Sequence, residues 1–400
     1  MLAFLANAAI YVVPFLLIIT VIVTVHEFGH FLTARAFGVA VDRFSIGFGR
    51  TLLSFRDRWG VEWRIASLPL GGYVRFSGDE NVASVPDQQD LSELKSEIAR
   101  REGVGAEKRY FYFKPLWQRA LIVAAGPAIN FVFAIGLLAL LVGWLGEPMG
   151  STRLSQVTPA SPAAAAGLRA GDDIKAIDGH ALDSFEDLST YVQDRPGAPL
   201  LVTLQRAGQT LTVPITAGIA LEPSPAGGVV KIGRLGVGSM LTLRRYNPIE
   251  ALGRGAVLTW KDVARTGAFL ARIVSSHDSW PLQGFLGAAH VTGAVTQSAI
   301  TDAQTEHASL ALMLAATYIN LTALLSISIG LVNLVPIPVL DGGHLLFYAY
   351  EAVARRPVPA GAQAAGYRVG LALLVGLMLF TAWHDLQRMQ VFHYLNALFS

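Results

Sequence analysis

Two histidines and a glutamate near the start of the chain have the spacing of a helical zinc site. Residues 24–30 read T-V-H-E-F-G-H, which contains the pattern H-E-x-x-H. Residues four apart share one face of a helix, so His26 and His30 can present both imidazoles to one metal ion. Glu27 lies beside them, where the general base of a hydrolytic zinc site would sit. The spacing therefore predicts zinc-dependent hydrolysis.

The H-E-x-x-H motif continues an apolar helix of membrane length, because residues 9–25 contain no charge. Single histidines in helices are usually structural, but ionisable groups are costly in a bilayer and are usually functional there. The apolar run has no basic region before it and no small-residue cleavage site after it, so it does not have the pattern of a signal peptide. We therefore expect a first transmembrane helix within residues 1–37.

The composition is that of a membrane protein. Hydrophobic residues make up 52% of the chain and charged residues only 15%, whereas soluble domains carry about a quarter charged residues. The formal net charge is +2 and no block of Lys and Arg is present, so no nucleic-acid partner is expected. There are no cysteines. Any metal must therefore be held by His, Asp or Glu.

Three further apolar segments predict a polytopic α-helical membrane protein with about four transmembrane helices. They lie within residues 120–146, 308–343 and 366–383. Residues 308–340 carry no charge across 33 positions, which is longer than one crossing needs. Pro336 and Pro338 should unwind the end of this segment and free backbone groups there.

The distribution of basic residues predicts the orientation. The stretch from Arg35 to Arg119 holds 14 of the 31 Lys and Arg residues. The positive-inside rule therefore places residues 38–119 on the cytoplasmic side. Arg355 and Arg356 mark the loop before the last helix in the same way. Both termini and the segment between the second and third helices should lie on the opposite face.

Hydrolytic zinc sites use three protein ligands, and the third must come from a distant part of this chain. No Glu stands in the setting that a thermolysin-like site needs. Thr33 and Ala36 replace the Gly and His of a metzincin motif. Asp341 is a better candidate, because it follows the third apolar segment on the predicted cytoplasmic side. The alternative is that Asp341 only caps the end of a helix before a Gly turn.

A short membrane-associated β-hairpin is expected within residues 38–119. Residues 63–76 look like two short strands around a break that contains Gly71 and Gly72, and residues 47–49 look like another turn. The hairpin could offer a strand edge to an unwound peptide substrate. It could equally be an ordinary surface hairpin, and the residues leave both interpretations open.

Residues 151–218 are soluble in composition and predict an inserted α+β domain. G-L-R-A-G-D-D-I at residues 167–174 and I-D-G at residues 177–179 resemble a PDZ domain, which binds peptide termini by strand addition. A generic α+β spacer is the alternative. Residues 219–307 are expected to form a Pro/Gly-rich connector up to residue 245 and then a helix over residues 248–275. That helix is either interfacial and amphipathic or a soluble connector.

The pairing of H-E-F-G-H with N-x-x-P-x-P-x-L-D-G-G at residues 333–343 resembles the site-2 protease family of intramembrane zinc proteases. The order of segments is similar to its bacterial RseP branch, with four crossings, a PDZ insert and A-G-P-A-I-N-F at residues 125–131. The resemblance covers nearly the whole chain. Members of that branch carry two tandem PDZ domains, whereas only residues 151–218 fit one here.

The resemblance implies a role for each motif residue. It implies Zn²⁺ bound by His26, His30 and Asp341, with Glu27 as the catalytic base. It also implies that Asn333 positions the scissile peptide and that the hairpin contacts substrate. The residues expected to bind substrate on this basis are Asn333, Pro336, Pro338, Gly71 and Gly72.

The expected function is intramembrane proteolysis in a bacterial inner membrane. The expected substrates are single-pass membrane proteins of the anti-sigma factor or signal-peptide-remnant type, cut from the cytoplasmic side, with the PDZ-like domain in the periplasm. One alternative is a catalytically inactive PDZ scaffold in the lipid bilayer, yet all four reactive positions are intact. A transporter is a second alternative, but no internal repeat supports it.

Overall fold

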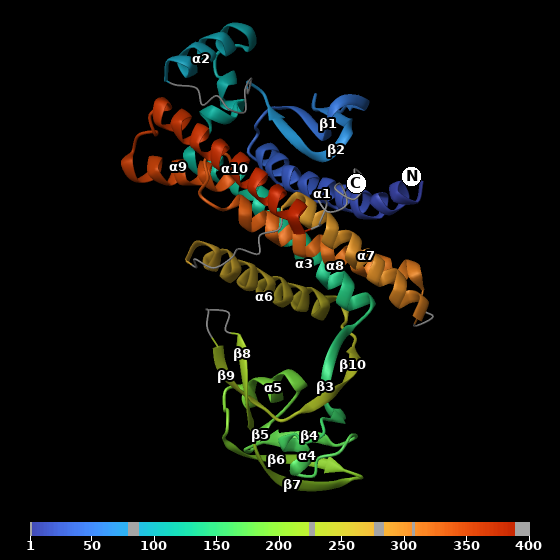
Figure 1. Cartoon of the computed structure of the whole chain (residues 1–400). Coiled ribbons are helices and arrows are strands. Elements are labelled where there is room, and N and C mark those ends of the chain that lie inside the picture. The colour runs from blue at the N-terminus through green and yellow to red at the C-terminus, as the bar shows by residue number, and fades with distance from the viewer. Residues whose placement is uncertain (1, 79–87, 224–228, 276–283, 306–308, 389–400) are drawn as a thin grey trace. The chain divides into compact units, whose positions relative to one another are not determined.

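The computed structural model describes residues 2–78, 88–223, 229–275, 284–305 and 309–388. The chain forms two compact units. The first combines Met1–Leu140 with Leu252–Ser400, and the second is Leu141–Ala251. Figure 1 labels the elements of both units.

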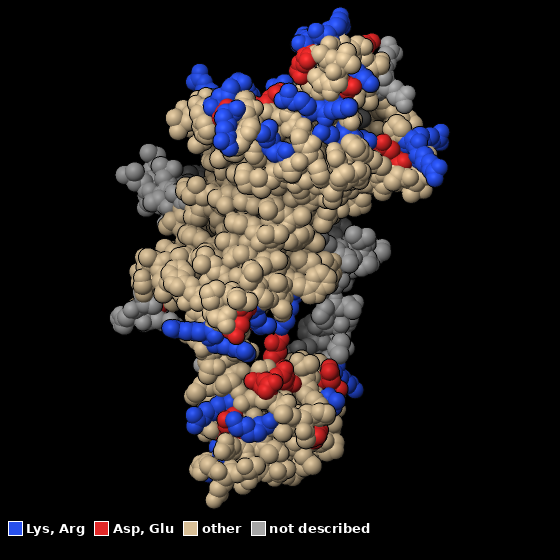
Figure 2. Space-filling view, turned by 180° about the vertical axis from the view of Figure 1, so that it is seen from behind, with Lys and Arg blue, Asp and Glu red and all other residues tan. Residues whose placement is uncertain are grey.

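In the described residues, four helices of the first unit are long and apolar enough to cross a membrane. They are α1 (Leu2–Ala36), α3 (Leu116–Trp144), α8 (Leu310–Asn333) and α10 (Ala360–Arg388). Figure 2 shows a broad band of this unit without charged side chains and a cluster of Lys and Arg beside it. The expectation of a membrane protein with about four apolar helices is confirmed.

Two helix boundaries differ from the segments expected, although the third segment unwinds at its prolines as predicted. α8 ends at Asn333, and Asp341 begins a separate helix, α9 (Asp341–Ala354). The prolines at 336 and 338 lie in the turn between these helices, so the helix ends before the run of apolar residues does. α10 is longer than residues 366–383, because small residues extend it back to Ala360.

The first unit also contains helices outside the membrane-length set. α2 (Gln88–Glu102) follows the β-hairpin, and α6 (Pro248–Ser275) matches the expected helix over residues 248–275. α7 (Phe285–Thr305) was not expected. Its N-terminus is capped by Asp385 of α10, whose carboxylate accepts hydrogen bonds from Gly284 N (3.0 Å) and Gly287 N (2.7 Å). A buried carboxylate at a helix N-terminus satisfies free N–H groups and favours the helix dipole.

The expected hairpin is larger than predicted. β1 (Val41–Arg56) pairs with β2 (Glu62–Phe76). Residues 47–49 are part of β1, so the turn expected there is wrong. β2 is continuous over the expected break, but its register changes there, and Phe44 is paired with both Trp63 and Val74. β1 therefore lies between two segments of β2, which share a core with Phe31 of α1.

The second unit is an α+β domain, as expected. β3 (Glu147–Val157), β4 (Asp173–Ile177), β6 (Pro199–Arg206), β7 (Gln209–Thr216) and β10 (Val237–Arg244) form a sheet in the order β10-β3-β4-β6-β7, and β5 (His180–Ala181) pairs with β4. α4 (Pro162–Ala165) and α5 (Phe185–Gln193) complete it. Leu154, Ile174 and Leu204 are fully buried in its core.

The connector expected at residues 219–245 is wrong for the described part of that segment. β8 (Gly218–Pro223) pairs with β9 (Val229–Arg234), and β10 pairs with β3 at the start of the same unit. Pro and Gly in this segment suggested a loop, but β10 pairs with β3 as the edge strand of the sheet, and this pairing cannot be seen from either segment alone. The compact unit therefore extends beyond the expected residues 151–218.

An ion pair joins the residue before β4 to the end of β6. The Asp172 carboxylate, 1% exposed, accepts hydrogen bonds from Arg206 Nε and Nη2 at 2.7 Å and from Arg169 N at 2.8 Å. The hydrogen bonds from Arg206 hold the pKa of Asp172 below its usual range. A depressed pKa means that the ion pair stabilises the fold above the unfolded-state pKa of about 3.9 and loses this effect as pH falls through the folded pKa.

We expect Asp172→Asn to lower the hydrogen-exchange protection of β4 and β6 about tenfold at neutral pH, as for loss of one charge-assisted hydrogen bond. The difference from the wild type should shrink as the pH falls from about 4 through the lowered pKa of folded Asp172, because the wild-type carboxyl is then protonated as well. Hydrogen-exchange mass spectrometry of the full chain in detergent measures this. Asp183→Asn, at an exposed position of the same unit, is the matched control. Equal protection in both variants would contradict a stabilising role for the pair.

Candidate metal centre

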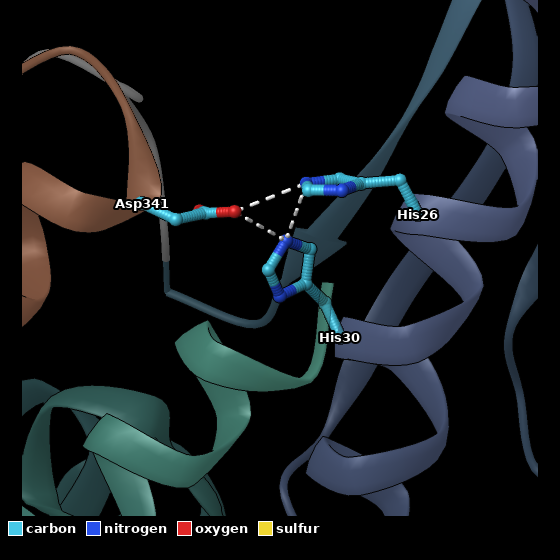
Figure 3. Close-up of side chains that lie close together, drawn as sticks. All are labelled: His26, His30 and Asp341. Atoms are coloured by element: carbon cyan, nitrogen blue, oxygen red, sulfur yellow. Dashed lines mark hydrogen bonds and ion pairs between the residues drawn. The ribbon is translucent and has the colours of Figure 1, made fainter. Parts of the chain in front are cut away.

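α1 presents His26 and His30 from one face, one helical turn apart. Their rings meet edge to face, with Nε2 atoms 3.2 Å apart (Figure 3). Asp341 Oδ2 lies 3.0 Å from His26 Nε2 and 3.5 Å from His30 Nε2. Three donor atoms from two distant parts of the sequence therefore converge on one point, as the sequence predicts.

The close approach of α1 and α3 depends on two glycines. A Cβ at Gly29 would overlap the carbonyl oxygen of Ala125 and lie 2.7 Å from Ile129 Cγ2. A Cβ at Gly126 would overlap the His30 ring and lie 2.8 Å from His26 Cε1. These glycines bring the helix backbones together and leave room for both imidazoles between them.

Asp341 is placed by the tight turn between α8 and α9. Leu340 N donates to the carbonyl of Ile337 at 2.8 Å. A Cβ at Gly342 would overlap the carbonyl oxygens of Leu334 and Val335. A Cβ at Gly343 would lie 2.5 Å from Pro338 Cα. The two glycines therefore let the turn fold against the first turn of α9, where Asp341 stands.

The donor set fits zinc. Zinc bound by His and Asp at about 2.0–2.2 Å in a tetrahedron has ligand atoms about 3.3 Å apart, and the three atoms here are separated by 3.0, 3.2 and 3.5 Å. Asp341 Oδ2 is buried, and no donor is aligned to form a hydrogen bond with it. Such an oxygen is costly unless a cation or donor meets it. Three protein ligands leave a fourth zinc position open, which is the pattern of catalytic rather than structural sites.

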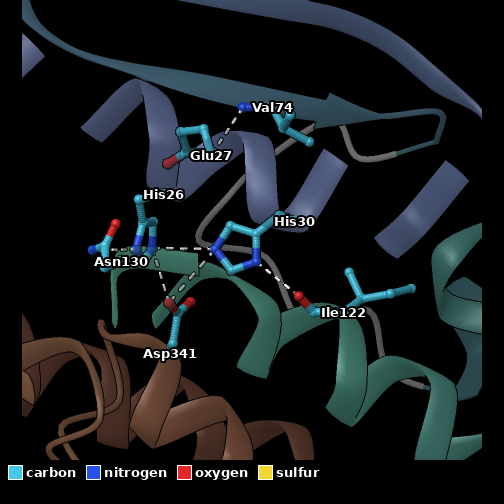
Figure 4. A network of polar contacts seen from close by, with 7 residues as sticks. All are labelled: His26, Glu27, His30, Val74, Ile122, Asn130 and Asp341. Atoms are coloured by element: carbon cyan, nitrogen blue, oxygen red, sulfur yellow. Dashed lines mark hydrogen bonds and ion pairs between the residues drawn. The ribbon is translucent and has the colours of Figure 1, made fainter. Parts of the chain in front are cut away.

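The contacts around the ligands orient the two rings (Figure 4). His30 Nδ1 donates to the carbonyl oxygen of Ile122 on α3 at 2.8 Å. A carbonyl only accepts, so His30 carries its proton on Nδ1 and keeps Nε2 free for a metal. His26 Nδ1 faces Asn130 of α3, whose Nδ2 lies 3.3 Å away.

Glu27 lies on the adjacent face of α1, beside the β-hairpin. Val74 N of β2 donates to Glu27 Oε2 at 3.1 Å. This hydrogen bond fixes the carboxylate next to the histidines and ties it to the sheet (Figure 4). No local pattern predicts this contact, because it joins a side chain to a backbone group 47 residues away.

The family match agrees with this geometry. A model described as peptidase family M50 matches residues 14–377. The chain belongs to peptidase family M50, the site-2 proteases. This confirms the family resemblance seen in the two motifs, although the single-PDZ branch stays a prediction.

Relatives of this M50 chain carry names that describe metalloproteases. The metalloprotease MmpA of Caulobacter vibrioides is 46% identical, covering 98% of this chain and 99% of that protein. A protein of Agrobacterium fabrum named as a zinc metalloprotease is 38% identical, covering 94% and 95%. A third, from Campylobacter jejuni, is 30% identical, covering 93% and 92%. The chain is a zinc metalloprotease.

Among solved structures, a protein of Geobacillus thermodenitrificans is 30% identical over 20% of this M50 chain and 85% of its own. Its TM-score of 0.16 is too low to bear on the fold. The PDZ identity of the second unit therefore stays a prediction.

A further ion pair in this M50 chain joins α3 to α9, the helix that begins with Asp341. Arg119 Nη2 of α3 lies 2.7 Å from Glu351 Oε1 of α9, and the guanidinium lies 5.0 Å from the centroid of the Tyr348 ring. Burial raises the pKa of Tyr348 to about 12, so its hydroxyl stays protonated at physiological pH. These contacts fix α9, and with it Asp341, against the helix that contacts His30.

The five residues expected to bind substrate in this M50 chain have different surroundings. Asn333 ends α8, Pro336 is exposed, and Pro338 is partly buried. Gly71 and Gly72 are buried, and a Cβ on them would lie 3.1 Å from Val23 Cγ1 and 2.5 Å from Ser45 O respectively. The close packing of β2 against α1 and β1 accounts for both glycines. The substrate-binding role of all five residues stays a prediction.

Proposed function

We propose that this M50 metalloprotease cleaves single-pass membrane proteins in or near their transmembrane segments. The observation that carries the proposal is that His26 and His30, on a helix of membrane length and beside Glu27, converge with Asp341 of α9. The chemistry of hydrolysis is supplied by this cluster, and the apolar surroundings select substrates that lie in the bilayer.

His26, His30 and Asp341 hold the zinc ion. When bound, zinc polarises a water molecule and the scissile carbonyl. Glu27 Oε2 accepts the amide hydrogen of Val74, so we assign proton transfer to Oε1. Glu27 removes a proton from water there and later delivers it to the leaving amine. The hydrogen bond from β2 holds one carboxylate oxygen of Glu27 and leaves the other for proton transfer.

The substrate must unwind before attack, because a transmembrane helix hides its carbonyls in hydrogen bonds between residues four apart. The edge of the β1–β2 sheet lies against α1 next to Glu27. Thr20 Oγ1 donates to Pro69 O at 2.5 Å, which holds the sheet against α1 nearly two helical turns before His26. A substrate strand that pairs with this edge would offset its lost helical hydrogen bonds. We assign a further substrate-binding role to Asn333, Pro336 and Pro338, which precede Asp341 at the end of α8 and in the turn after it.

The enzyme resides in a bacterial inner membrane, with the metal centre toward the cytoplasm. The basic residues of the segment between α1 and α3 support this orientation. The second unit is a PDZ-like domain on the periplasmic side that binds peptide termini, supported by the motifs at residues 167–179. Anti-sigma factors and signal-peptide remnants are the substrate types that fit a single-pass topology.

Removal of zinc provides a direct test. We expect vesicles that contain the purified enzyme to cut a single-pass reporter with a shortened periplasmic tail, with product masses that place the cut in or beside its apolar segment. A zinc chelator should reduce cleavage to background, and added Zn²⁺ should restore it.

The matched control is the same reporter with its apolar segment replaced by a soluble linker. Equal cleavage of this control, or a cut far from the apolar segment, would contradict the proposed substrate class. Zinc-independent cleavage would contradict the proposed mechanism.

A further inference from the structure

Asn130 of α3 is fully buried, and its carboxamide faces His26. Nδ2 lies 3.3 Å from His26 Nδ1, and Oδ1 is buried without a hydrogen-bond donor. In the described residues, the polar side chain within hydrogen-bonding distance of this carboxamide is His26. An Asn that served only to join helices would be expected to satisfy its acceptor.

The hydrogen bond that links α3 and α8 next to Asn130 uses the backbone of Asn130 and not its side chain. Ser326 Oγ, also fully buried, donates to the carbonyl oxygen of Asn130 at 2.9 Å. Gly330 of α8 allows close packing here, since its Cβ would lie 3.3 Å from Asn130 Cβ. The helices are therefore joined without the Asn130 side chain, which leaves the carboxamide for another role.

The chemistry of the neighbouring ligand indicates that role. A histidine that binds a metal through Nε2 carries its proton on Nδ1 and needs an acceptor there. His30 has the carbonyl of Ile122 as that acceptor. His26 has Asn130 at the equivalent place. Because amide oxygen and nitrogen exchange by a half-turn of the group, hydrogen-bond chemistry decides which atom faces the ring.

We propose that Asn130 is a positioning residue for the zinc ligand His26: its Oδ1 accepts the Nδ1 proton and holds the ring in the tautomer that presents Nε2 to the metal. This rests on the proposed ligand set. Outer contacts of this kind typically change metal affinity 10–100-fold. Turning the carboxamide by a half-turn also gives the buried Oδ1 a hydrogen-bond donor, the Nδ1–H group of His26.

The test compares zinc affinities of the full chain in detergent by competition with a fluorescent chelator. Asn130→Leu removes the acceptor at similar volume, and Asn130→Asp keeps an acceptor. We expect Asn130→Leu to bind zinc about 10–100-fold more weakly and Asn130→Asp to stay within about threefold of the wild type. The absorption bands of the Co²⁺-loaded protein should change in Asn130→Leu and be restored in Asn130→Asp, which a helix-packing role would not produce.

Ser326→Ala is the matched control, because it removes the α3–α8 hydrogen bond and leaves the carboxamide in place. It should bind zinc like the wild type. Asn130→Ala provides a second acceptor-free variant if Leu does not fit the buried site. Wild-type affinity in a folded acceptor-free variant, or an equal loss in Asn130→Asp, would overturn the proposal.

His26→Ala separates this proposal from the ligand assignment on which it rests. Loss of zinc in His26→Ala together with wild-type affinity in Asn130→Leu would reject the role of Asn130 alone. Retention of zinc in His26→Ala would reject the ligand set itself.

Discussion

Glu27→Gln is expected to keep stoichiometric zinc and to cleave a single-pass substrate about 10²–10⁴-fold more slowly. General-base catalysis contributes about this much. Gln has nearly the shape of Glu, and its amide oxygen can still accept the Val74 N–H that now reaches Oε2. The substitution therefore removes the proton acceptor and retains the contact with the sheet. Initial rates in vesicles and metal analysis of the same preparation measure both quantities.

The control for Glu27→Gln is the same change at Glu97. That carboxylate lies on α2, 46% exposed, in an ion pair with Arg101 at 2.6 Å. Exposed pairs of this kind contribute little, so Glu97→Gln should cleave at the wild-type rate. Cleavage by Glu27→Gln at that rate would exclude Glu27 as the base. If Glu27→Gln lost both its zinc and its cleavage activity, Glu27 would instead support the metal centre.

The grouping of His26 and His30 with Asp341 could be predicted because each piece of evidence is local. H-E-x-x-H sets its own geometry on a helix, and charge-free runs mark the membrane segments. The distribution of basic residues then suggests that both motifs lie at the same membrane face. The third ligand follows from this arrangement, even though more than 300 positions separate it from the first two.

The parts that could not be predicted depend on contacts between distant segments. The double pairing of Phe44 within the sheet is one case, because register is set by both partners and not by either strand alone. β10 is another, since it is recognisable as a strand of the second unit only through its pairing with β3. Asn130 and Gly126 belong to the motif at residues 125–131, but only the packing of α3 on α1 shows that they lie beside the two histidines.

Gly126→Ala is expected to disable the metal centre with the addition of a single methyl group. The new Cβ would overlap His30 Nε2 and Cε1 and lie 2.8 Å from His26 Cε1. Carbon atoms in normal contact are about 3.5–4.0 Å apart, so α3 or the imidazoles must move by roughly 1 Å. A misplacement of about 1 Å can cost about 100-fold in activity. We expect a loss of this size in cleavage, with at least about tenfold weaker zinc binding.

Gly136→Ala on the same helix is the matched control, because a Cβ at Gly136 meets no atom within 4 Å. Ala is favoured over Gly in a helix by about 1 kcal/mol, so both variants gain the same local preference. Helix content and unfolding temperature should therefore be retained in Gly136→Ala along with zinc and activity. Equal zinc affinity in the two variants would show that the imidazoles do not depend on the space at Gly126. A selective loss in Gly126→Ala would show that the close crossing of α1 and α3 is a requirement of the metal centre and not only of helix packing.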